Sequence, residues 1–122
     1  MMQSNPAHPA TPREWQPTAS GNAELTLSTV AAGRLPALRM DFDFKGGGGF
    51  VVARRAFSRK MPVQYAVRFR LRGRGAVNNL ELKLVDATGH NVWRHVIKDL
   101  HLPARWRRIE SAWRPRRAPR GA

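Results

Sequence analysis

The chain has no cysteine, no long apolar run and few acidic residues. Because none of its 122 residues is cysteine, disulfide cross-links and thiol chemistry are excluded. No apolar stretch approaches the roughly 20 residues that a membrane-spanning helix needs, so no membrane partner is expected. Residues 1–14 are polar and carry three prolines, rather than the basic start and apolar block of a secretory signal peptide. This pattern predicts no export by that route.

The charge of the chain is strongly unbalanced. It has 22 Lys+Arg but only 8 Asp+Glu, which gives a formal net charge of +14 at pH 7. Only four of the bases are lysines, so the excess is arginine, and seven arginines lie between residues 105 and 120. An excess of this kind favours contact with polyanions but does not specify a fold. The length suffices for one domain with a single core.

Alternating apolar and polar residues predict short β-strands along the chain. In the segment 63–72, large apolar side chains alternate with three arginines, so the two kinds lie on opposite faces of a strand. The run 78–93 predicts a strand, the turn Asp86–Gly89 and a second strand. Similar patterns predict strands at 25–30, 38–45, 50–57 and 106–113, with a hairpin turn at Gly46–Gly49. Many short strands without a helical period favour an all-β antiparallel sandwich.

Three segments are expected along the chain. Residues 1–20 are rich in proline, serine, threonine and alanine and are predicted to be a disordered leader. Residues 21–113 carry the strand pattern and form the β-sandwich module. Residues 114–122 are rich in arginine and proline, lack any periodicity and are predicted to be a disordered tail.

The strand and glycine pattern resembles a known type of bacterial module. Its most specific part is the run 78–93, with Gly89 in the turn and Trp93 on the second strand. Leu38–Phe44 with the glycines that follow, and Tyr65–Leu71 with Gly73 and Gly75, extend the likeness over residues 14–113. The pattern resembles the galactose-binding-like jelly roll. It is similar to family 11 carbohydrate-binding modules, to the complex I intermediate-associated protein fold, and to the sandwich accompanying discoidin (factor 5/8 type C) domains in bacterial glycoside hydrolases.

The resemblance implies a jelly-roll sandwich and a function. That function is non-catalytic: carbohydrate binding, or an accessory role in a polysaccharide-active bacterial protein. The implied partners are a polysaccharide or oligosaccharide and a catalytic domain or protein in trans, and the implied location is extracellular or periplasmic. A structural calcium held by Asp41, Asp43 or Asp86 is a further expected feature, since calcium takes carboxylate oxygens. No other cofactor is expected.

Sugar sites in β-sandwiches combine an aromatic platform with planar charged groups that bond paired hydroxyls. The candidates here lie on the non-core side of two predicted strands, with a tryptophan as platform: Arg68, Arg70, Glu81, Lys83 and Trp93. The alternative for the four charged residues is a solvated face on which opposite charges pair across strands. The alternative for Trp93, and the expectation for Trp106 and Trp113, is a place in the core.

Catalysis has no support in the sequence. No pair of carboxylates sits in a glycosidase motif, and no Ser-His-Asp pattern with a nucleophile elbow occurs. The chain is therefore not expected to be an enzyme.

Nucleic-acid binding is the alternative function. A basic stripe could contact phosphates, and neighbouring aromatic residues could stack on bases, although no RNA- or DNA-binding signature is present. The stripe comprises Arg54, Arg55, Arg59, Arg68, Arg70, Arg72 and Arg74.

The chain departs from the sandwich modules at two places. Arg94 stands where a second aromatic residue is expected after Trp93, and Arg114-Pro115 leads into the tail where a further strand is expected. The C-terminus therefore looks truncated, and the sandwich is expected to lack its last strand or strands, which exposes a neighbouring strand edge. A truncated, non-functional fragment is accordingly a third hypothesis.

Overall fold

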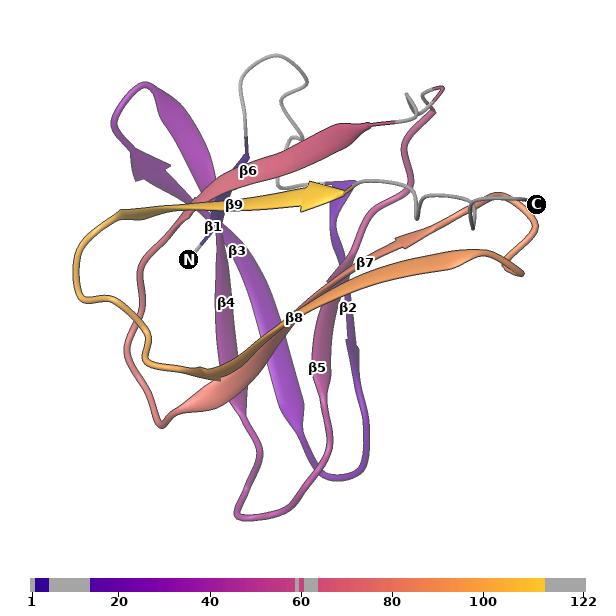
Figure 1. The fold of residues 1–122 in the computed structure, drawn as a ribbon. Coiled ribbons are helices and arrows are strands. Elements are labelled where there is room, and N and C mark those ends of the chain that lie inside the picture. The colour runs from indigo at the N-terminus through magenta and orange to yellow at the C-terminus, as the bar shows by residue number, and fades with distance from the viewer. Residues whose placement is uncertain (1, 5–13, 59, 61–63, 114–122) are drawn as a thin grey trace.

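The structure of the protein, a computed structural model, describes residues 2–4, 14–58, 60 and 64–113 (Figure 1). These residues form β-strands that pair antiparallel throughout, so the predicted all-β antiparallel class is confirmed. The described part of the chain contains no helix with the length and apolar character that a membrane crossing requires. The finer jelly-roll topology stays a prediction.

The strands form one large sheet and two ribbons. The sheet has five strands in the spatial order β3 (Glu24–Ala32), β4 (Leu35–Asp43), β1 (Met2–Ser4), β6 (Tyr65–Leu71) and β9 (Arg107–Trp113). One ribbon pairs β2 (Gln16–Ala19) with β5 (Val51–Arg54), and the other pairs β7 (Asn78–Val85) with β8 (Val92–Leu100). Within the described residues the two ribbons are not hydrogen-bonded to each other or to the large sheet.

The core lies between β6, β9 and the β7–β8 ribbon. Phe69, Leu71, Leu100 and Ile109 are buried there, and partly buried apolar side chains of β7 and β8 pack against them. Burial of such a side chain stabilises the fold by about 1.5–3 kcal/mol. Because successive side chains on a strand point to opposite faces, the apolar residues of β6 define the inner face of the sheet, and its arginines lie on the outer face.

Two strands lie in the segment that was predicted to be a disordered leader. β1 pairs with both β4 and β6, and β2 pairs with β5, so the prediction is wrong for residues 2–4 and 16–19. The backbone groups of these residues bond to neighbouring strands whatever the side-chain composition. A low apolar content therefore does not exclude a β-strand. Other predictions lie outside the described residues: those for 5–13, for residue 63, for Arg59 of the basic stripe and for the tail 114–122.

The glycine-rich loop is not a hairpin turn. β4 pairs with β3 and β1, whereas β5 pairs with β2, so Gly46–Gly49 carries the chain from the large sheet to a ribbon. The loop starts with a tight turn in which Gly47 N donates to Phe44 O at 3.0 Å. Lys45 and Gly46 both adopt positive φ there, at 52° and 74°.

Candidate functional site

The five residues predicted to bind sugar do not lie together. Arg68 and Arg70 are on β6 of the large sheet, whereas Glu81 and Lys83 are on β7 of a separate ribbon. The hydrogen-bonded neighbours of β6 are β1 and β9, so β6 and β7 are not neighbours in a sheet. The four charged side chains lie on exposed strand faces, as alternation predicted, but alternation carries no information about which strand lies alongside.

Trp93 lies on the other side of the ribbon from the two charged residues of β7. It is directly opposite Leu84, and therefore shares the core-facing side of the ribbon with the leucines of β7. It is nevertheless 47% exposed, so it is not a buried core residue. The indole cannot act as a platform for a ligand held by Glu81 and Lys83, which point the opposite way.

Three of the four predicted charged residues take part in exposed ion pairs. Arg68 Nε lies 2.7 Å from Glu110 Oε2 on β9, which is directly opposite in the register. Glu81 Oε1 lies 3.2 Å from Arg94 Nε on β8 and 4.0 Å from Lys83 Nζ on its own strand. All five side chains are exposed, so each pair stabilises the fold by at most about 1 kcal/mol. Solvated pairing across strands is thus what the structure shows for Arg68 and Glu81.

A different cluster gathers on the outer face of β6 and β9 and on the residues next to their ends, and we call it the arginine face: Arg70, Arg72, Trp106 and Arg108. The guanidinium carbons of Arg70 and Arg72 lie over the Trp106 ring, 5.4 Å and 5.1 Å from its centroid. Each such cation–π contact contributes about 0.5–1 kcal/mol at an exposed position. Arg108 is directly opposite Arg70 in the strand register.

The arginine face concentrates positive charge. Arg70 and Arg108 are directly opposite each other, and like charges in this position destabilise a strand pair. Glu110, the one acid within β6 and β9, forms an ion pair with Arg68. Two loops at the same end of these strands are joined by a hydrogen bond from Gly73 N to Pro103 O at 2.8 Å, and they carry the exposed Arg74 and Arg105. An anionic ligand would be attracted to positive charge gathered in this way.

Sequence reasoning placed Trp106 in the core, and this was wrong. Its side chain is half-buried on the outer face, beneath two arginines. The signal that could have found it is parity, because Trp106 has the same parity as Arg108 and Glu110 and the opposite parity to the buried Ile109. The side chain of Trp113 lies outside the described part of the chain.

The predicted basic stripe is divided between two parts of the fold. Arg54 belongs to the β2–β5 ribbon, and Arg55 follows it, with its Nε 2.7 Å from Glu14 Oε2. Arg68 to Arg74 instead follow β6 and the loop after it. Only the second group contributes to the arginine face.

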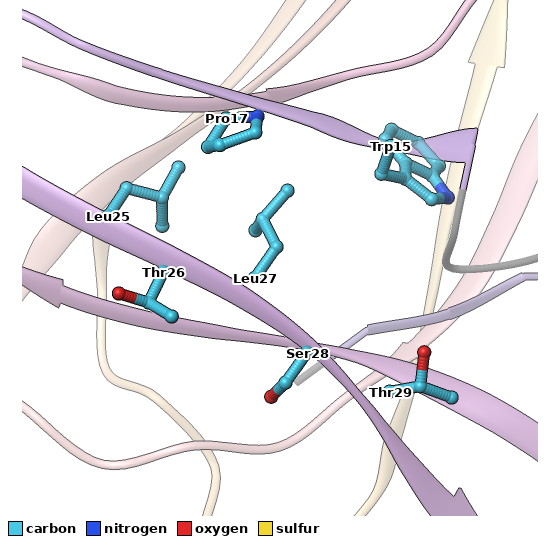
Figure 2. Close-up of a pocket in the computed structure, with 7 residues that line it drawn as sticks. All are labelled: Trp15, Pro17, Leu25, Thr26, Leu27, Ser28 and Thr29. Atoms are coloured by element: carbon cyan, nitrogen blue, oxygen red, sulfur yellow. The ribbon is translucent and has the colours of Figure 1, made fainter.

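A hollow of about 480 Å³ lies between β2 and β3 (Figure 2). We call it the Trp15 hollow, and its lining residues are Trp15, Pro17, Leu25, Thr26, Leu27, Ser28 and Thr29. Leu25 and Leu27 point toward Pro17 and Trp15, whereas Thr26 and Ser28 point to the other side of β3 (Figure 2). The interior is therefore mostly apolar, with one indole ring.

The carboxylates suggested as calcium ligands do not converge. Asp41 pairs with Arg39, with Oδ2 2.9 Å from Nε, and Asp43 Oδ1 accepts a hydrogen bond from Lys45 N at 2.7 Å. Both lie on β4, while Asp86 lies at the turn of the β7–β8 ribbon. Across the described ranges, no group of three metal-ligating side chains comes together.

Asp86 shapes the turn between β7 and β8. Its Oδ1 accepts hydrogen bonds from Thr88 Oγ1 at 2.7 Å and Gly89 N at 3.0 Å, and its Oδ2 accepts one from Asn91 Nδ2 at 2.6 Å. These bonds to Asn91 and Thr88 hold the pKa of Asp86 below its ordinary value of 3.8. The carboxylate is thus occupied by donors of its own turn.

Asp86→Asn is expected to weaken the acid sensitivity of the fold and to lower stability at pH 7. The folded pKa is depressed, so the stabilisation from this carboxylate is present above the unfolded pKa of about 3.9 and is lost as pH falls through the folded pKa. Urea denaturation between pH 7 and pH 2.5 measures both effects. Asp99→Asn, which removes a carboxylate from the same ribbon, controls for net charge. An unchanged loss of stability in acid would contradict this role of Asp86.

Comparison with known proteins gives no family for this chain. No model of a protein family, no curated protein and no solved structure matches it. The resemblance to galactose-binding-like modules therefore stays a prediction, and the choice of a site rests on the geometry above.

Proposed function

We propose that the protein is a non-catalytic binding module for polyanions, and that the arginine face is its binding site. The observation that carries this proposal is the pair of guanidiniums held over Trp106 on an exposed sheet face, with Arg108 beside them. A guanidinium presents planar N–H donors that match carboxylate, sulfate and phosphate groups. Contact with the indole reduces the freedom of these side chains, which lowers the entropic cost of binding.

The charge balance of the whole chain supports the same proposal. Acidic side chains are already engaged with bases in several parts of the fold, as in Glu14 with Arg55, Glu24 with Lys45 and Glu110 with Arg68. Because 22 bases face only 8 acids, intramolecular pairing cannot neutralise the arginines. The resulting field attracts polyanions and speeds their encounter with the protein.

A neutral carbohydrate at the Trp15 hollow is the second candidate, in keeping with the resemblance to carbohydrate-binding modules. The observation that favours it is an aromatic ring beside a hollow of about 480 Å³, within the usual size range of ligand pockets. The charged planar groups typical of sugar sites are missing from its lining. This candidate is therefore the weaker one.

The double variant Arg70→Ala/Arg72→Ala is expected to bind dextran sulfate about tenfold more weakly at 0.1 M salt. Two anion contacts are lost, so the dependence of affinity on salt should also become shallower. The matched control is Arg34→Ala/Arg54→Ala, which removes two exposed arginines and the same charge elsewhere. Isothermal titration over a salt series measures both quantities.

Two results would contradict the proposal. An equal loss in the control variant would mean that net charge, and not the arginine face, determines binding. Salt-insensitive binding to a neutral β-glucan, without binding to dextran sulfate, would favour the Trp15 hollow instead.

A further inference from the structure

We infer that the polyanion bound by the arginine face is a single-stranded nucleic acid. This inference rests on the proposed function and adds the chemical class of the ligand. Two features of the face carry it: the planar groups that gather at Trp106, and the exposure of the face at the edge of the sheet.

The first feature is the combination of an indole with guanidinium planes. Nucleic-acid bases stack on aromatic rings and on arginine planes, and such stacking contributes about 1–3 kcal/mol per base. Trp106 and the arginines above it bring both kinds of plane to one place on the surface. An acidic polysaccharide has no π-face, so this arrangement would give it only charge contacts.

The second feature is the exposure of the face. β9 is an edge strand of the five-stranded sheet (Figure 1), and Arg70 and Arg108 are exposed on β6 and β9. A single strand leaves its bases unpaired, so they can stack on the planar groups of this face. The arginine face includes no asparagine or glutamine to read base edges, so little sequence preference is expected.

The test compares a charge-preserving variant with the wild type on two probes. Arg70→Lys/Arg72→Lys keeps the charge but removes the planar guanidiniums. We expect it to bind a labelled fifteen-nucleotide oligothymidine about tenfold more weakly in fluorescence polarisation, while its affinity for dextran sulfate changes less than about threefold. Arg34→Lys/Arg54→Lys is the matched control. Trp106→Phe, which keeps an aromatic ring, should retain more oligothymidine binding than Trp106→Leu.

The outcomes distinguish failure of the nucleic-acid inference from failure of the proposed polyanion binding. Equal changes on both probes in the lysine variant would overturn the nucleic-acid inference and leave polyanion binding intact. A duplex that binds as tightly as oligothymidine would overturn the single-strand inference. If the folded wild-type chain binds neither dextran sulfate nor oligothymidine at low salt, the proposed function itself fails.

Discussion

Phe69→Ala is expected to lower the free energy of unfolding by about 3–5 kcal/mol, the range for truncating a buried phenylalanine. Phe69 is 5% exposed and packs with Leu71, Leu100 and Ile109 at the centre of the core. A domain of this kind is stable by only about 5–15 kcal/mol. The substitution should therefore leave a large part of the protein unfolded near 37 °C. Urea denaturation followed by tryptophan fluorescence measures the loss.

Phe57→Ala is the matched control for this variant. It removes the same atoms from a side chain that is 51% exposed and lies after β5. The expected loss is below about 1 kcal/mol, because little apolar contact disappears. Equal losses in the two variants would show that the cluster around Phe69 is not the part of the molecule that holds the fold together.

Gly49→Ala is expected to lower the free energy of unfolding by about 1–3 kcal/mol. Gly49 has a φ of 134°, which side chains rarely adopt, and an added Cβ would lie 2.7 Å from Ser20 Oγ and 3.1 Å from Ser20 O. Ser20 cannot retreat easily, because its N donates to Phe50 O at 3.0 Å and its Oγ accepts from Phe50 N at 2.8 Å. Thermal and chemical denaturation measure the effect.

The neighbouring glycine supplies the control. An added Cβ at Gly48 meets no atom within 4 Å, and its φ lies outside the positive range. Gly48→Ala should therefore be neutral, or stabilising by up to about 1 kcal/mol through the unfolded state. If both variants lose the same stability, the loop requires glycine throughout and the contact between Gly49 and Ser20 has no special role.

Strands with strict alternation were predictable from the sequence alone. The four apolar residues Leu38 to Phe44 fall within or next to β4, and the leucines from Leu80 to Leu84 lie on the core-facing side of β7. In β7 the period of two reflects a strand with one face toward the core and one toward solvent. β4 departs from this pattern, because Ala37 and Leu38 on opposite faces are both buried and Phe42 is 40% exposed. β1 and β2 have no such period in the sequence, and their pairing with β4, β6 and β5 is what identifies them as strands.

The candidate site was only half predictable. Parity placed the arginines of β6 on the outer face, as the structure confirms. It could not indicate that β9 lies alongside β6, and that pairing brings Trp106 and Arg108 to Arg70. Strand pairing depends on the path of the whole chain, and loops as long as the one between β6 and β7 leave several pairings open to local reasoning.

The position of β1 sets the order in which the sheet can be completed. Met2 pairs with Leu38 and with Leu71, and β1 occupies the middle of the five strands. During synthesis, the amino-terminal strand must therefore wait for β6 to leave the ribosome before the two halves of the sheet can join. Contacts so distant in sequence slow folding. Until they form, the edges of β4 and β6 are open to pairing with other chains, so the vulnerable period for aggregation falls on the nascent protein.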